Sequence, residues 1–139
     1  MGNKIVVLDS HQFNDNRISK HIERVRGSYA IFRLNFNFYP ERKLESSDEG
    51  RAHIFNVGRF SSPYLNGALF TLGTLLGGRK RKAERLLRSA FIDEGDRVIF
   101  HVHDPYLLGL ALGLSRRFPD SRVVYDRHEY YDAWDNHLG

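Results

Sequence analysis

Short apolar runs alternate along the chain with segments whose apolar residues recur at helical spacing. The short runs are rich in β-branched and aromatic residues and predict five strands, at residues 4–8, 29–36, 52–57, 97–102 and 122–125. The first run, KIVVL, has no polar alternation, which is typical of a strand covered on both faces of a parallel sheet. The pattern therefore predicts a buried sheet between layers of other elements.

The segments with helical spacing predict helices at residues 14–27, 60–91 and 104–118. The second segment is expected as two pieces that break near Gly77 and Gly78. The third begins with Asp104 as a capping residue and Pro105 in the first turn, and it is apolar nearly all round, so it should pack deeply. Residues 37–50 are rich in polar and turn-forming residues and predict a loop.

Strands that alternate with helices predict an α/β fold in which a doubly wound, mainly parallel sheet carries helices on both faces. Sheets of this Rossmann-like class bind ligands beyond the carboxyl ends of their strands, where the strand order reverses. With 139 residues the chain is long enough for one domain with a buried core. We therefore expect a single Rossmann-like domain over residues 1–139.

The composition of the chain excludes some kinds of site and restricts where the protein is expected to be located. The chain has no cysteine, so disulfides, thiolate metal sites and cysteine nucleophiles are excluded. The opening MGNKIVVLDS turns polar too early for a signal peptide, and no apolar stretch reaches the roughly 20 residues of a spanning helix. We expect a cytoplasmic protein, with at most a peripheral contact at the inner face of the membrane.

The net charge of +4 is concentrated in a basic block that begins at Arg79 and ends at Arg88. This block is amphipathic, and the apolar residues 64–76 precede it. Such a block can contact an anionic membrane, or it can be a solvated helix face. Nucleic acid is not expected as a partner, because the block lacks interleaved aromatic residues.

Polar side chains follow three of the predicted strands at the point where each strand ends. If these strands are neighbours in the sheet, the following side chains converge on one crevice: Asp9, Ser10, His11, His101, His103, Asp104, Asp126, His128 and Glu129. His128 is the best candidate for a catalytic role, because an imidazole in a crevice can act as acid, base or phosphate donor near neutral pH. Asp104 could instead be only a helix cap, and Asp126 could order the loop that follows it.

A metal site is a second interpretation of the same residues. His101, His103, Asp126 and His128 could supply nitrogen and oxygen ligands to a metal-dependent hydrolase. His101 lies within its strand, and His103 could equally serve packing, so a crevice without metal or cofactor is favoured. The loop DSHQFNDNR after the first strand contains no glycine-rich phosphate-binding motif, which disfavours a dinucleotide-binding domain and a P-loop NTPase.

Three stretches together resemble the N-terminal domain of a GT-B glycosyltransferase of the family 4 type: KIVVLDSHQFNDNRISKHIERV, HVHDPYLLGLALGL and VVYDRHEYY. The resemblance spans most of the chain and is strongest over residues 98–131. It implies the acceptor-side domain of an enzyme that moves a sugar from a nucleotide-sugar to a hydroxyl acceptor, without a cofactor. In that family a C-terminal domain binds the nucleotide-sugar, so the chain is expected to be a fragment that is inactive alone.

The resemblance also implies roles for single residues. His128 resembles the histidine that faces the donor sugar and its diphosphate, and this is the expected catalytic position. The expected substrate-binding positions are Ser10, His11, Asp15, Arg17, His103, Asp104, Asp126 and Glu129. The basic block that begins at Arg79 could bring in a lipid-linked acceptor. A stand-alone α/β module for ligand binding or protein interaction is the alternative.

Overall fold

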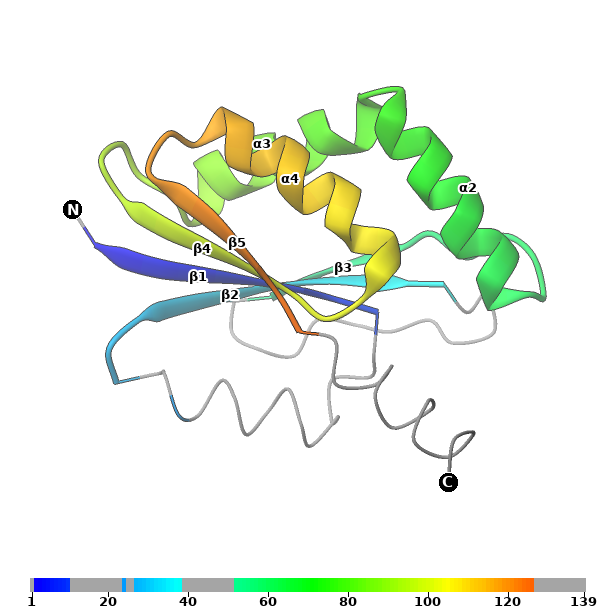
Figure 1. Ribbon diagram of the computed structural model, residues 1–139, viewed down its shortest axis with the longest axis horizontal. Coiled ribbons are helices and arrows are strands. Elements are labelled where there is room, and N and C mark those ends of the chain that lie inside the picture. Colours follow the sequence, from blue (N-terminus) through cyan, green and yellow to red (C-terminus); the bar gives the residue numbers. More distant parts are fainter. Residues whose placement is uncertain (1, 11–23, 25–26, 39–51, 127–139) are drawn as a thin grey trace.

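Five parallel strands form one sheet in the computed structural model, which describes residues 2–10, 24, 27–38 and 52–126 (Figure 1). The strands are β1 (Asn3–Asp9), β2 (Ala30–Asn37), β3 (Ala52–Asn56), β4 (Arg97–Val102) and β5 (Ser121–Tyr125). Their order across the sheet is β3-β2-β1-β4-β5, and every neighbouring pair is parallel. The predicted Rossmann-like α/β fold is confirmed, and each predicted strand end is correct to within about one residue.

The helices of the described residues lie together on one face of the sheet (Figure 1). They are α2 (Pro63–Leu75), α3 (Gly78–Ala90) and α4 (Leu108–Arg117), and the 3₁₀ turn η1 (Pro105–Leu107) precedes α4. α2 and α3 separate where predicted, because Gly77 adopts a φ of 88°, which glycine tolerates best. Of the helix predicted at residues 14–27, the structure describes only helical Arg24 and the turn at Gly27.

The main hydrophobic core lies between the sheet and these helices. Successive strand residues point to opposite faces, so alternate residues of each strand enter this core. Val6, Leu8, Leu34 and Phe100 are completely buried there, and α2 adds Phe70. Burial of each such side chain stabilises the folded state by about 1.5–3 kcal/mol relative to an exposed one. The core therefore fixes α2, α3 and α4 on one side of the sheet.

The sequence of α4 is apolar nearly all round, but only one side of the helix is buried. Leu110, Ala111 and Leu114 are completely buried, whereas Leu112 is 47% exposed.

At the other end of this helical layer, a Cβ on Gly67 would lie 2.6 Å from the Tyr106 ring, so glycine lets η1 approach α2 closely. Among the described residues, no helix is long and apolar enough to cross a membrane.

A buried ionic cluster joins the start of β1 to the turn before β4. The Lys4 ammonium lies 2.6 Å from the Asp96 carboxylate, which is almost completely buried. The same carboxylate accepts hydrogen bonds from the backbone N–H groups of Gly2 and Asp93, at 2.8 and 2.7 Å. Burial alone would raise the pKa of Asp96, but these donors, Lys4 first, lower its pKa to about 2. The cluster therefore stabilises the ionised carboxylate.

This cluster predicts a specific loss of stability in acid. The pKa of Asp96 is lowered in the folded state, so its contribution is complete above the unfolded-state pKa of about 3.9 and is lost as the pH falls toward about 2. We expect Asp96→Asn to cost roughly 2 kcal/mol at pH 7 and progressively less below about pH 4. Urea denaturation followed by circular dichroism measures the difference.

The matched control is Asp93→Asn, because Asp93 also contacts Lys4, at 3.3 Å, but its side chain is 87% exposed. This exposed pair should contribute less than about 1 kcal/mol at any pH. An Asp96→Asn cost that stays constant from neutral to acid pH would contradict the assignment.

Candidate functional site

The strand order reverses between β1 and β4. β2 pairs with one side of β1, and β3 pairs with the outer side of β2. The next strand, β4, pairs with the other side of β1, and β5 pairs with the outer side of β4. The ends of β1, β4 and β5 are therefore neighbours, as the sequence predicted. In doubly wound sheets this reversal is where ligands bind.

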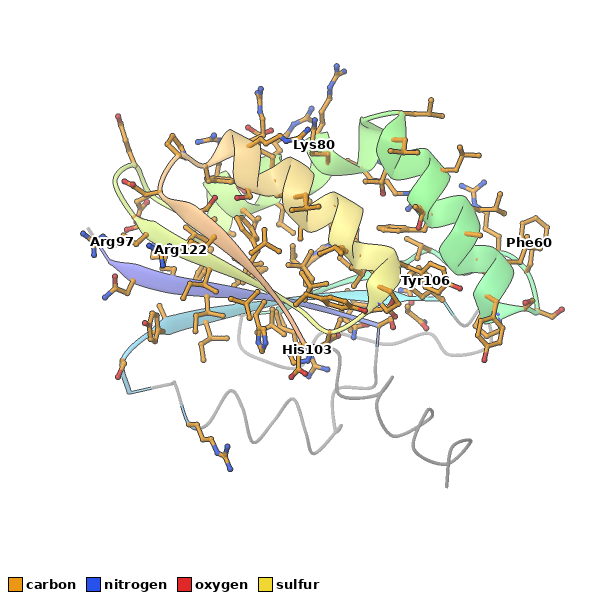
Figure 2. All side chains as sticks on the ribbon, in the orientation of Figure 1. Phe60, Lys80, Arg97, His103, Tyr106 and Arg122 are labelled. Carbon is orange, nitrogen blue, oxygen red and sulfur yellow. The ribbon has the colours of Figure 1, made fainter. Side chains whose placement is uncertain are left out.

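Buried polar residues occupy the carboxyl half of the face that the described helices leave uncovered. Near the start of the strands this face is apolar, with Ile5, Val7, Ile31 and Ile99 packed together. Toward the strand ends it carries a polar set, each member at most 5% exposed: Asp9, Arg33, Asn35, Asn37, His101 and His103. In Figure 2, His103 lies on the side of the sheet opposite α2, α3 and α4. Polar side chains are thus concentrated at the end of the sheet where doubly wound folds in general bind ligands.

Asp9 is held by two residues of β2. The strand register places Asn35 opposite Asp9 and Arg33 opposite Val7. Arg33 Nε donates to Asp9 Oδ2 at 2.6 Å, and Asn35 Nδ2 donates to Asp9 Oδ1. Because Arg33 is 3% exposed and Asp9 is completely buried, this is an interior ion pair. Asp9 therefore connects the ends of β1 and β2.

His101, His103 and Asp126 form a second cluster on the same face. The His101 and His103 rings pack edge to face with centroids 4.2 Å apart, and His103 Nδ1 lies 4.0 Å from Asp126 Oδ2. The His103 side chain is only 2% exposed, whereas that of Asp126 is 36% exposed. Asp126 is therefore the member that meets solvent, and His103 lies behind it.

The residue types of this cluster fit a divalent metal. One potential ligand atom from each of His101, His103 and Asp126 lies within 4.8 Å of the others. Ligand atoms of a tetrahedral zinc site are about 3.4 Å apart, since each lies about 2.1 Å from the ion. The ligand atoms of these three side chains would have to approach one another by up to about 1.4 Å to bind zinc, which small changes of their torsion angles could supply.

Ser10 and Asp104 join the ends of β1 and β4 directly. Ser10 Oγ donates to Asp104 Oδ2, and the Tyr106 backbone N–H donates to Asp104 Oδ1 at 2.8 Å. The prediction that Asp104 caps the following helical turn is confirmed. In addition, the His103 backbone N–H donates to the Leu8 carbonyl at 3.0 Å, which continues the pairing of the strands beyond β4. Both strand ends are therefore fixed in position.

Of the site residues expected from the sequence, four are described and lie at this one edge: Ser10, His103, Asp104 and Asp126. The other five lie outside the described residues, and their roles stay predictions: His11, Asp15, Arg17, His128 and Glu129. The described part of the site thus comes from the ends of β1, β4 and β5.

The polar residues of β2 were not among the predicted site residues. In AIFRLNFN, polar Arg33, Asn35 and Asn37 alternate strictly with apolar residues, and this period of two could have predicted a strand with one polar face. Asn37 was expected to begin a loop, but it is the last residue of β2 and is buried. The alternation continues the strand one residue beyond the predicted end. Residues 39–50 of the predicted loop lie outside the described residues.

Comparison with known proteins finds no family model, no curated protein and no solved structure that matches this chain. The resemblance to GT-B glycosyltransferases is therefore carried by the three quoted stretches alone. Functional inference depends on the sheet order and on the side chains that meet at its edge.

The buried Asp9–Arg33 pair predicts strong coupling between two substitutions. Removing one partner leaves the other charge in the interior, so Asp9→Leu and Arg33→Met should each cost about 3–5 kcal/mol of unfolding free energy. The double variant should cost clearly less than the sum, because no buried charge of this pair remains. Urea denaturation of all four proteins measures the coupling. Arg97→Met is the control, since Arg97 is exposed. Strictly additive costs would contradict the interior ion pair.

Proposed function

We propose that this chain forms the acceptor-side part of a cytoplasmic glycosyltransferase that moves a sugar from a nucleotide-sugar to a hydroxyl acceptor. The observation that carries the proposal is the gathering of Ser10, His103, Asp104 and Asp126 where the strand order reverses. Doubly wound sheets bind their ligands at this point. The three stretches that resemble GT-B glycosyltransferases contain the ends of β1, β4 and β5, so they meet at the same place.

The side chains at this edge suit a ligand rich in hydroxyl groups. A carboxylate accepts hydrogen bonds from hydroxyls, and a serine hydroxyl or an imidazole can donate or accept. Asp126 is partly exposed, and the buried His103 ring lies 4.0 Å behind its carboxylate. We assign contact with the acceptor to Asp126 and a positioning role to His103.

The charges at this edge favour an acceptor over a diphosphate. The Asp9 charge is balanced by Arg33, while Asp104 and Asp126 add negative charge beside it. A diphosphate is normally held by backbone N–H groups of a glycine-rich loop or by cations, and the loop after β1 lacks that glycine motif. A neutral hydroxyl acceptor meets no such repulsion.

In the proposed reaction, the bond between the anomeric carbon of the sugar and the diphosphate oxygen breaks, and a bond forms between that carbon and the acceptor oxygen. The nucleoside diphosphate leaves with the electron pair of the broken bond, and the proton of the acceptor hydroxyl passes to water. Asp126 orients this hydroxyl by accepting its hydrogen bond. His128 is proposed to stabilise the negative charge that develops on the leaving diphosphate.

The test is release of nucleoside diphosphate by the protein expressed from its complete reading frame. Labelled uridine and guanosine diphosphate hexoses are supplied with hydroxyl acceptors, and product is identified by mass spectrometry. We expect Asp126→Asn and His128→Ala each to lower kcat by about 100-fold or more, because each removes a group that positions or stabilises reacting atoms. Melting temperatures should stay close to that of the parent protein.

The control is His53→Gln, because His53 lies on β3, the outermost strand on the side of the sheet away from β5. It should leave turnover unchanged. EDTA should also leave turnover unchanged, because no step is assigned to a metal. If EDTA abolishes the activity and Zn²⁺ restores it, the result would favour the alternative of a metal-dependent hydrolase that uses His101, His103 and Asp126. Failure of every nucleotide-sugar, or full activity of both site variants, would refute the transferase proposal.

A further inference from the structure

One face of α2 presents a row of large apolar side chains to solvent. They are between 43% and 83% exposed: Tyr64, Leu65, Leu69, Leu72, Leu75 and Leu76. At 100° per residue these positions fall within one arc of about 140° on the helix. The opposite side of α2 packs against the rest of the domain, where Asn66, Gly67 and Phe70 are buried. α2 therefore has an exposed apolar face in addition to the face that is buried in the domain.

A hollow opens at the end of this row, between the end of β3 and the junction of α2 with α3. It has a volume of about 560 Å³, within the range of small-ligand sites. Phe36, Phe55 and Val57 line its apolar part, and Leu76 lies at the end of α2 beside it. Three cationic side chains also line it: Arg59, Arg79 and Lys82. The hollow thus combines apolar walls with positive charge, as a site for an amphiphilic anion requires.

Arg79 is held in position on the wall of this hollow. Its guanidinium carbon lies 4.7 Å from the centroid of the Phe70 ring, and a Cβ on Gly73 would come within 3.3 Å of its Nε. Burial lowers the pKa of Arg79, and the positive charge of nearby Arg59 lowers it further. The positive charges of Arg79 and Arg59 repel each other, and an anion placed between them would stabilise both.

The cations that line the hollow differ in their partners from Arg88 of α3. Arg88 donates to Glu84 at 3.2 Å and to the Arg117 carbonyl at 2.9 Å, so it joins α3 to α4. In the part of the chain that the structure describes, no carboxylate forms an ion pair with Arg59, Arg79 or Lys82. The positive charge next to the apolar row is therefore available to an external anion.

We propose that the surface formed by the apolar row of α2, the hollow and the adjacent cations docks on a bilayer of anionic phospholipids. The leucines enter the interface between headgroups and acyl chains, and the hollow receives a lipid phosphate between Arg59, Arg79 and Lys82. Amphipathic helices with leucines on one side and Lys or Arg beside them bind membranes in this way. The assignment does not depend on the glycosyltransferase proposal.

A bilayer fits this surface better than a second copy of the chain. A twofold dimer through α2 would bring the same patch of each copy together, so the cations around the hollow of one copy would approach those of the other. Anionic lipids supply the opposite charge and an apolar layer at once.

Vesicle sedimentation tests the proposal. The protein is mixed with vesicles of phosphatidylcholine alone or of phosphatidylcholine with phosphatidylglycerol, and the bound fraction is measured. We expect binding to the anionic vesicles, and a decrease of about tenfold or more in partitioning for Arg79→Gln/Lys82→Gln and for Leu72→Gln/Leu75→Gln. Leu72 and Leu75 are 57% and 79% exposed, so this variant should fold normally, which circular dichroism verifies.

The charge-matched control is Arg97→Gln/Arg122→Gln, which also removes two positive charges. Arg97 and Arg122 lie at the far end of the sheet from α2 (Figure 2), so their loss should leave binding unchanged. Equal binding to neutral vesicles, no binding to anionic ones, or a control variant that loses as much as Arg79→Gln/Lys82→Gln would overturn the proposal.

Two further outcomes would replace the bilayer by another occupant. If inorganic phosphate raises the melting temperature through Arg79 and Lys82 while vesicles do not sediment the protein, the hollow is a free-anion site. If size-exclusion chromatography shows a dimer that Leu72→Gln/Leu75→Gln dissociates, and vesicles again fail to bind, the apolar row is a subunit interface. Either result would overturn membrane docking.

Discussion

All five strands run in the same direction, and this constraint places every strand end along one edge of the sheet. Main-chain hydrogen bonds between β1 and its two neighbours fix that alignment, and the order β3-β2-β1-β4-β5 then decides which ends are close together. The ends of β1, β4 and β5 bring Ser10, His103 and Asp126 to the reversal of strand order. The end of β3 opens instead into the hollow lined by Arg59 and Arg79. The same end of the sheet thus carries two chemically different groups of side chains.

The two faces of the sheet differ because side chains alternate along each strand. One face packs against α2, α3 and α4 with residues such as Leu34 and Phe100, and it accounts for most of the apolar burial. The other carries Asp9 and Arg33 in its interior, where desolvation of both charges is costly and only close pairing offsets it. Such a pair adds little net stability, but it fixes the geometry of the strand ends, which a ligand site needs.

Much of this fold could be predicted from local sequence patterns. Apolar runs such as residues 5–8 mark central strands, and a cap such as Asp104 followed by Pro105 marks a helical start. The polar face of β2 was also readable in principle, from the alternation of Arg33, Asn35 and Asn37. The strand order was assumed from the fold class, because nothing local encodes which strands are neighbours.

Other features depend on packing that no single segment encodes. Hydrophobic periodicity shows that α2 is apolar, but only the assembled domain shows that Leu72 and Leu75 are left outside. The basic block was similarly treated as one feature, although Arg88 is bound to Glu84 while Arg79 lines the hollow. The approach of His103 to Asp126 follows from the register between β4 and β5.

The proposed function rests on the claim that a hydroxyl-bearing ligand binds where the strand order reverses. The most direct measurement is a titration of the ¹⁵N-labelled protein with methyl hexosides, followed by the chemical shifts of backbone amides. The claim predicts that the largest shifts belong to Ser10, His103 and Asp126, with little change at Gly2 and Arg97 at the opposite ends of the strands. Saturable shifts centred on those opposite ends, or on the hollow beside Arg79, with none at Ser10 and Asp126, would contradict it.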